Sequence, residues 1–495
     1  MTDPIASCHL IAGTAVSAPE SSIRGFNPAT GEAIGAFYPE AGSGEVNAAL
    51  EAADAALFDS AWRSAVKRAE FLEAVASEIE SLGDLLIETA MAETGLPQAR
   101  LVGERGRTCG QLRAFASHLR SDGNRLTPIV DQADSSRQPL PKPGLVRTQE
   151  PLGPVVVFGA SNFPLAFSTA GGDTASAWAA GCPVVVKAHP SHPNTCQIVA
   201  GAINRATVSS GLPGGVFSQL HGLAKTGSLL VTHPLAAGVG FTGSKSAGLA
   251  LWRLANDRPC PIPVFAEMGS VNPQIFLPAA LASRGQALAE GLFGSLTLGG
   301  GQFCTNPGLS LGIASPEWEA FLEVLKGKIK SAPLCQMLNA GIAENYERLA
   351  RDFHLEAKAD GEQACRTAPC LTLSSAEELL AKPKMAEEVF GPFHLAVTCR
   401  DLDELKSVLI SLEGQLTCSL FFDEEDRAVL QELLPLAGRK AGRVIGNGFP
   451  TGVEVSPAMQ HGGPFPATTD PRFTSVGIAA MERWLRPVCW QDLPF

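Results

Sequence analysis

Short uncharged runs of β-branched residues, each followed by a longer segment rich in small residues, dominate the middle of this sequence. VVVF (155–158) and VVVK (184–187) are followed by segments that suit helices, and GVGFTG (238–243) precedes SKSAGLALWRLAND. Strands that are apolar on both faces and alternate with helices predict a parallel sheet covered by helices on both sides. The fold class is therefore α/β.

A second set of alternating strands and helices is predicted between about 264 and 446. Its strand-like strings are VFAEMG, QIFLP, SLGIA, FHLAVTC, TCSLFFD and GRVIGNG. A chain of 495 residues exceeds the size that one core supports, so we expect two α/β domains in tandem. Helical periodicity is expected over 45–120, and the Pro- and Gly-rich stretch 127–144 suits a hairpin or linker.

The charge balance narrows the classes of partner. The chain has 38 Lys+Arg against 50 Asp+Glu, a net charge of −12. This acidic balance, without a basic block, argues against nucleic acid and anionic membranes as partners. Residues 151–172 carry no charge and are long enough to cross a bilayer, but prolines and glycines interrupt them and Asp173 follows at once. A buried strand leading into a buried helix is the better interpretation.

The twelve cysteines contain no C-x-x-C pair and no zinc-ligand spacing with histidine, so no metal site is predicted. Their density is far below that of a disulfide scaffold. The N-terminus has no Lys or Arg before Arg24, unlike a secretory signal peptide. We therefore expect a cytoplasmic protein with reduced thiols, most of them packing residues.

One glycine-rich segment is a candidate phosphate site. GVGFTG matches G-x-G-x-x-G literally, but its first glycines fall where the strand should begin. A better reading places the turn at Gly243-Ser244 and the following helix over 245–255. Amides at that helix N-terminus could hold a phosphate, or the segment could be a plain strand-turn-helix connection.

Three residues could carry covalent chemistry. Cys304 lies in LTLGGGQFCTNPG, where glycines allow close approach to a substrate and free amides for an oxyanion. The alternative is a buried structural cysteine. Glu267 ends an apolar strand and is either a helix cap or a general base. Asn162, in GASNFP, caps its helix or directs its amide at an oxyanion.

Seven strings occur together in order. They are FNPATGE (26–32), SNFP (161–164), VVVKAHPSHPNT (184–195), FTGSKSAG (241–248), EMGSVNP (267–273), GQFCT (301–305) and EEVFGPF (387–393). With these strings the sequence resembles the aldehyde dehydrogenase superfamily over nearly its whole length. The resemblance implies the aldehyde dehydrogenase fold, with two tandem Rossmann-like domains and a small β ribbon for oligomerisation.

The same resemblance implies a division of the chain. Residues 1–126 and 150–266 would form the NAD(P)-binding domain, and 267–470 the catalytic domain with the nucleophilic cysteine. Residues 127–149 and 471–495 would form the ribbon, which pairs subunits into a homodimer or homotetramer.

Roles for single residues follow from the resemblance. Cys304, as thiolate, would attack the aldehyde to give a thiohemiacetal, whose oxyanion the Asn162 amide and the Cys304 backbone N–H would stabilise. Hydride transfer to the nicotinamide would leave a thioester, which Glu267 would hydrolyse by activating water. The implied cofactor contacts are Lys187 and Glu388 to the ribose hydroxyls, Ser244 beside Gly243 to the pyrophosphate, and Phe390 near the nicotinamide ribose.

One departure from the family pattern bears on the cofactor. Three residues after Lys187, NAD-preferring members commonly have Glu, whereas this chain has Pro190. Losing the acid removes repulsion toward a 2′-phosphate, and His189 or His192 could add a donor. We predict that NADP is accepted and preferred over NAD.

The C-terminal stretch also departs from the common pattern. HGGPFPATTDPRFTSVGIAAMERWLRPVCWQDLP (461–494), with KAHPSHPNT, resembles the branch that contains 2,5-dioxopentanoate (α-ketoglutaric semialdehyde) dehydrogenases and a related fatty aldehyde dehydrogenase. This resemblance implies oxidation of 2,5-dioxopentanoate to 2-oxoglutarate. It makes His461 a candidate active-site residue, the alternative being a loop histidine bonded to backbone.

Two other functions stay open at this stage. The first is a medium- or long-chain aliphatic aldehyde as substrate. The second is a catalytically silent protein of this fold with a binding or structural role, which the presence of Cys304, Glu267 and Asn162 disfavours.

Overall fold

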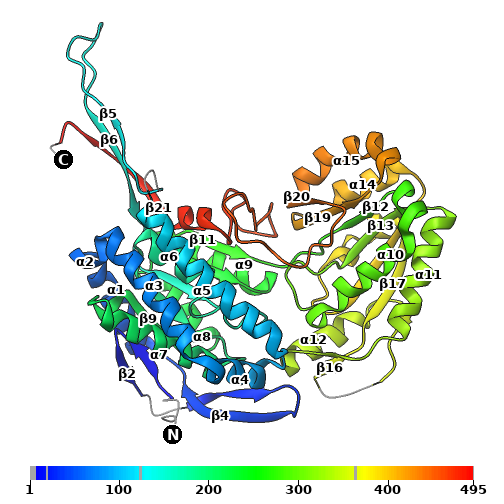
Figure 1. Cartoon of the computed structure of the whole chain (residues 1–495), viewed down its shortest axis with the longest axis horizontal. Coiled ribbons are helices and arrows are strands. Elements are labelled where there is room, and N and C mark those ends of the chain that lie inside the picture. The colour runs from blue at the N-terminus through cyan, green and yellow to red at the C-terminus, as the bar shows by residue number, and fades with distance from the viewer. Residues whose placement is uncertain (1–6, 18–20, 122–124, 362–364, 494–495) are drawn as a thin grey trace.

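Two seven-stranded sheets organise the chain in this computed structural model, which describes residues 7–17, 21–121, 125–361 and 365–493 (Figure 1). The predicted α/β class is confirmed. The N-terminal segment without a basic start includes residues 1–6, which lie outside the described residues. Among the helices of the described part, none is long and apolar enough to cross a membrane.

The first sheet has the order β11-β10-β7-β8-β9-β1-β2. Its strands are β11 Val264–Glu267, β10 Gly238–Thr242, β7 Val155–Phe158, β8 Val184–Lys187, β9 Phe217–Leu220, β1 His9–Ile11 and β2 Thr14–Val16. The first five are parallel, whereas β1 and β2 add antiparallel pairs at one edge. Parallel strands bring their carboxyl ends to one edge of the sheet, where α/β proteins bind ligands.

Helices cover both faces of this sheet. They are α1 Ser43–Leu57, α3 Ala65–Ser81, α5 Gln98–Arg120, α6 Gly172–Ala180, α7 Pro193–Ser209, α8 Ala224–Thr232 and α9 Lys245–Asn256, with the short α2 Ser60–Arg63 and α4 Gly83–Thr94 between them. Val155 and Val157 pack in one core with α3, α5, α6 and α7, whereas Val156 and Phe158 pack in a second core with α1, α8 and α9. This two-sided burial explains the unbroken apolar run of β7.

The second sheet has the order β15-β17-β18-β13-β12-β19-β20. Its strands are β15 Ala357–Lys358, β17 Cys370–Ser375, β18 Phe393–Cys399, β13 Leu309–Ile313, β12 Gln274–Phe276, β19 Gln415–Phe421 and β20 Ala441–Gly446. Its helices are α10 Pro278–Thr297, α11 Pro316–Lys330, α12 Ala340–Ala350, α13 Ala376–Ala381, α14 Leu402–Ser411 and α15 Arg427–Lys440. The VFAE strand, expected here, instead pairs with β10 in the first sheet, because α9 returns the chain to that edge.

A three-stranded antiparallel ribbon protrudes from the first unit, which is the first sheet with its covering helices (Figure 1). Its strands are β5 Ile129–Asp131, β6 Leu145–Pro151 and β21 Leu485–Gln491. Only β21 of the expected C-terminal ribbon segment pairs with β6. The preceding turn, η5 Ile478–Trp484, packs on the first unit instead, where buried Trp484 donates its indole N–H to Ser176 Oγ at 2.8 Å.

The twelve cysteines form no disulfide in the structure, and most are buried as expected. Cys260 and Cys489 are exposed, contrary to a packing role.

Candidate active site

A cavity of about 640 Å³ opens at the carboxyl ends of β7, β8, β10 and β11. It brings together every predicted cofactor residue and three of the four predicted catalytic residues. Those lining it are Lys187, His189, Pro190, Gly243, Ser244, Glu388 and Phe390, together with Asn162, Glu267 and Cys304. The fourth, His461, lies directly behind Cys304 and Glu267.

The Gly243-Ser244 turn joins β10 to α9, as predicted. Ser244 is the N-cap of α9, and its Oγ accepts from the Ala247 amide at 3.4 Å. A Cβ on Gly243 would lie 2.7 Å from the Phe241 ring, so a larger residue here would require that side chain to shift. The first amides of α9 thus face a cavity wall with the dipole orientation that suits a phosphate.

Two ionisable side chains in the cavity have shifted pKa values. Burial lowers the pKa of Lys187 to about 8, and no described residue pairs with its ammonium group. Burial raises the pKa of Glu388 to about 7, against the opposing effect of the Ser270 amide. A buried lysine without a partner and a buried carboxyl group at the same cavity fit the polar ribose hydroxyls of a dinucleotide.

The two histidines named as possible 2′-phosphate donors differ in position. His189 lines the cavity, where its Nδ1 accepts from the Ser191 amide at 3.1 Å. Burial lowers its pKa well below the usual range, so the ring is neutral and could donate only through Nε2. His192 is wrong as a donor, because it is fully buried and its Nε2 is bonded to Ser168 Oγ at 3.0 Å.

The three glycines before Cys304 shape its loop. Gly299, Gly300 and Gly301 have φ values of 56°, 68° and 68°, in the left-handed region that favours glycine. A Cβ on Gly301 would overlap the backbone of Gly391. Glycine is therefore needed here because other parts of the chain pack closely against this loop. The predicted close approach of a substrate to these glycines is not required to account for them.

Asn272 fixes the other side of this loop. Its Nδ2 donates to Cys304 O and to Asn306 O, both at 2.9 Å, from a backbone with φ of 49°. Sequence reasoning missed this role, although Asn272 lies within the EMGSVNP string. The residue positions the cysteine without touching its sulfur.

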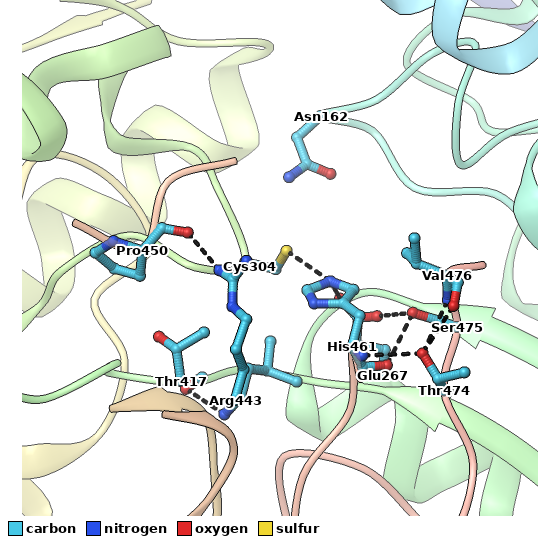
Figure 2. A network of polar contacts seen from close by, with 12 residues as sticks. Asn162, Glu267, Cys304, Thr417, Arg443, Pro450, His461, Thr474, Ser475 and Val476 are labelled. Atoms are coloured by element: carbon cyan, nitrogen blue, oxygen red, sulfur yellow. Dashed lines mark hydrogen bonds and ion pairs between the residues drawn. The ribbon is translucent and has the colours of Figure 1, made fainter. Parts of the chain in front are cut away.

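Asn162 does not cap a helix, since α6 begins only at Gly172. Its buried side-chain Nδ2 donates to the backbone oxygen of Gln302 at 2.9 Å. The backbone carbonyl of Asn162 accepts from Arg100 Nη2 at 2.8 Å. In Figure 2 the Asn162 side chain points toward Cys304. The amide is therefore held next to the thiol loop, where it can meet an oxyanion.

Cys304, Glu267 and His461 form one polar cluster, in which Glu267 and His461 are buried and Cys304 is partly exposed (Figure 2). His461 Nε2 lies 3.6 Å from Cys304 Sγ and 3.0 Å from Glu267 Oε1. Ser475 Oγ donates to Glu267 Oε2 at 2.6 Å, an interaction that sequence reasoning missed. His461 Nδ1 is buried and has no hydrogen-bond partner among the described residues.

The electrostatics of the cluster distinguish its members. Burial, followed by the nearby Glu267 charge, raises the pKa of Cys304 well above its usual value, so the resting group is a thiol. Burial alone would raise the pKa of Glu267, but the contacts with His461, Ser475 and Cys304 together hold it below the usual value. An ionised carboxylate thus lies beside a protonated thiol, an arrangement suited to proton abstraction.

The same three side chains offer sulfur, nitrogen and oxygen atoms within 4.8 Å of one another. Such a set could also bind a transition metal. No local spacing in the sequence indicated it, because the three residues are far apart in the chain.

Comparisons with known proteins agree with this geometry. The model of the aldehyde dehydrogenase family matches residues 15–344. The chain belongs to the aldehyde dehydrogenase family. It is 52% identical over 494 residues to "Alpha-ketoglutaric semialdehyde dehydrogenase 2" of Azospirillum brasilense, covering 98% of this chain and 94% of the relative.

A second relative is the alpha-ketoglutaric semialdehyde dehydrogenase of Acinetobacter baylyi, 46% identical over 492 residues, with 98% of this chain and 93% of the relative covered. Among solved structures, 1-pyrroline-5-carboxylate dehydrogenase from Thermus with bound NAD superposes with a TM-score of 0.81. It is 21% identical and covers 98% of this chain and 92% of its own, so it supports the fold alone. The protein is an NAD(P)-dependent aldehyde dehydrogenase.

Proposed function

We propose that this enzyme oxidises 2,5-dioxopentanoate to 2-oxoglutarate and prefers NADP. The identity of 52% over 98% of the chain with the Azospirillum relative carries the substrate assignment. The presence of Cys304, Glu267 and Asn162 around one cavity disfavours a catalytically silent protein.

Cys304 is the nucleophile in this proposal. Its proton moves to the neighbouring Glu267 carboxylate, and the sulfur attacks the aldehyde carbon to form a thiohemiacetal. The Asn162 amide and the Cys304 backbone N–H stabilise the oxyanion that develops on the former carbonyl oxygen. The aldehyde, a poor hydride donor, is thereby converted into a thiohemiacetal, which is a better one.

A bound NAD(P) would supply the hydride acceptor that allows the thiohemiacetal to become a thioester. After releasing the thiol proton to solvent, Glu267 takes a proton from water, whose oxygen attacks the thioester. The acid is released, and Glu267 returns this proton to the departing Cys304 thiolate. His461 and Ser475 position the carboxylate from its two oxygens.

The cofactor would lie in the cavity of the first unit, formed by residues 1–126 and 150–266, with the thiol supplied from 267–470. Lys187 and Glu388 would hold ribose hydroxyls, the Gly243-Ser244 turn the pyrophosphate, and Phe390 the nicotinamide ribose. Pro190 supports NADP, because a carboxylate at that position would repel a 2′-phosphate.

The ribbon supports a homodimer or homotetramer. Ile129, Val130 and Leu140 are 57%, 53% and 69% exposed on it, and β5 is an edge strand. Apolar side chains on a protruding edge suit pairing with a second copy. The free cysteines suit a reducing compartment, so we place the enzyme in the cytoplasm.

A steady-state panel of 2,5-dioxopentanoate, succinic semialdehyde and decanal, each with NADP and NAD, tests the proposal. We expect kcat/KM with 2,5-dioxopentanoate and NADP to exceed every other combination. A higher value with decanal would overturn the substrate assignment in favour of an aliphatic aldehyde.

A further inference from the structure

Helix α5 presents three charged side chains to the loop that carries Asn162. Arg100, Glu104 and Arg107 are spaced four and three residues apart, so they share one face of the helix. This face packs behind the segment 162–167. The three side chains differ in how many of their polar atoms form hydrogen bonds within the protein.

Two of them are committed to the backbone of that loop. Arg100 Nη2 donates to Asn162 O at 2.8 Å. Glu104 Oε1 accepts from the amides of Leu165 and Ala166 at 2.8 and 3.0 Å. These bonds fix the loop, and the second Glu104 oxygen, Oε2, lies 3.9 Å from Arg100 Nε without a hydrogen-bond partner among the described residues.

Arg107 is different. Its Nε and Nη2 are buried and have no hydrogen-bond partner, and no carboxylate of the described residues lies within ion-pair distance. Glu104, Glu267 and Glu454 are the nearby acidic charges, and Cys304 is the other titratable group that acts on it. A guanidinium in this setting stays protonated, and its charge lies over the Phe167 ring without a carboxylate bonded to it among the described residues.

Ring contacts place this charge close to the reacting sulfur. The Arg107 guanidinium lies 5.4 Å from the centre of the Phe167 ring. That ring lies 6.4 Å from the ring of His461, whose Nε2 is 3.6 Å from Cys304 Sγ. Two rings in series, those of Phe167 and His461, therefore lie between Arg107 and the nucleophile.

Arg443, a second arginine near the sulfur, has a structural role that Arg107 lacks. Arg443 donates through Nη1 to Gly452 O at 2.9 Å and through Nη2 to Pro450 O at 2.7 Å (Figure 2). It ties down the 450–452 loop beside Cys304. Arg107 makes no such tie, although burying a charge costs more than it returns without a partner.

We propose that Arg107 binds the carboxylate at the far end of the substrate and so selects oxo-acid aldehydes over uncharged ones. The inference rests on the proposed function, in which the aldehyde carbon meets Cys304. Three carbons separate the aldehyde from the carboxylate in 2,5-dioxopentanoate, so the carboxylate lies only a few bonds from the carbon that meets Cys304. An incoming carboxylate would supply the partner that the guanidinium nitrogens lack.

The test compares Arg107→Met and Arg107→Lys with wild type on 2,5-dioxopentanoate and on pentanal, an uncharged aldehyde of equal length. Arg105→Met is the control, because Arg105 is on the same helix but donates to Gly83 O at 2.9 Å. We expect R107M to lower kcat/KM for 2,5-dioxopentanoate about 30-fold or more, with pentanal changed less than about threefold. R107K should retain part of the preference, and R105M should leave both values near wild type.

Thermal unfolding gives a second readout. Because Arg107 lacks a partner, R107M should keep or raise the Tm, whereas loss of a structural residue would lower it. Equal losses on both aldehydes, or a marked fall in Tm, would overturn the inference. A wild-type enzyme that oxidises 2,5-dioxopentanoate no better than pentanal would refute the proposed function instead.

Discussion

His461 Nε2 lies 3.0 Å from Glu267 Oε1, and both side chains are buried. The same nitrogen is 3.6 Å from Cys304 Sγ, so one ring atom faces the proposed base and the proposed nucleophile. The other ring nitrogen, Nδ1, is buried and has no hydrogen-bond partner among the residues that the structure describes. The pair is thus arranged to keep Glu267 ionised in a site where burial alone would protonate it.

Replacing His461 should change the pH dependence of catalysis. His461→Gln removes contacts that lower the pKa of Glu267 and leaves burial as the main influence, so this pKa should rise. The acid limb of the kcat profile should then move to higher pH. Ser475→Ala, which removes one hydrogen bond, should shift it less; an unchanged acid limb in H461Q would contradict the pairing.

Replacing His461 with Gln should also change the pH dependence of the free energy of unfolding. A carboxyl group whose folded pKa is depressed stabilises the protein above its unfolded pKa of about 4.3, and this is lost as pH falls through the folded pKa. H461Q should therefore be less stable than wild type at neutral pH. The difference in free energy of unfolding should shrink as the pH falls below about 4, as urea titrations at several pH values would reveal.

Cys304→Ser should abolish turnover, because a serine hydroxyl lacks the nucleophilicity of a thiolate at this site. We expect kcat to fall by about 10³-fold or more, with cofactor binding, followed by fluorescence, close to wild type. Cys260→Ser is the matched control, since Cys260 is exposed, and it should retain full activity. Unchanged NADPH production by C304S would refute the assignment of the nucleophile.

Glu267→Gln should impair both halves of the reaction. The amide cannot take a proton from the Cys304 thiol or from water, so we expect kcat to fall about 10²- to 10⁴-fold. Rapid mixing should show no burst of NADPH, and mass spectrometry should show no acyl group on Cys304. A burst with an accumulating acyl group would contradict Glu267 as the base for the thiol and leave it as the base for water.

Pro190→Glu tests the basis of the cofactor preference. A carboxylate at this cavity position should repel a 2′-phosphate, so kcat/KM with NADP should fall about tenfold or more, with NAD changed little. Steady-state kinetics of both enzymes with both cofactors measures this. A wild-type preference of about tenfold or more for NAD would contradict the proposal.

The ribbon should determine the oligomeric state. Ile129→Asp combined with Val130→Asp places two charges on the exposed edge strand β5, where they would oppose pairing with another copy. Light scattering should show a dimer or tetramer for wild type and a smaller species for the variant. A monomeric wild type would rule out this assembly.

Local sequence patterns missed β1, β2, β15 and β17, but they were sufficient for most strands of both sheets, for the Gly243-Ser244 turn and for the position of Cys304. Each depends on neighbours within about twenty residues, whose apolar period and glycines report directly on backbone and burial. Patterns of this kind misplaced the start of α6 and the sheet to which β11 belongs, since both depend on packing against distant segments.

The relationships that define the site were decided by the tertiary structure. Ser475 and Glu267 are 208 residues apart, and Cys304 and His461 are 157 apart, so no sequence spacing brings them together. Arg107 carries no motif at all, and its missing partners become visible only once the loops around it are folded. A sequence can name reactive residue types, but hydrogen-bond satisfaction and buried charge are properties of the packed chain.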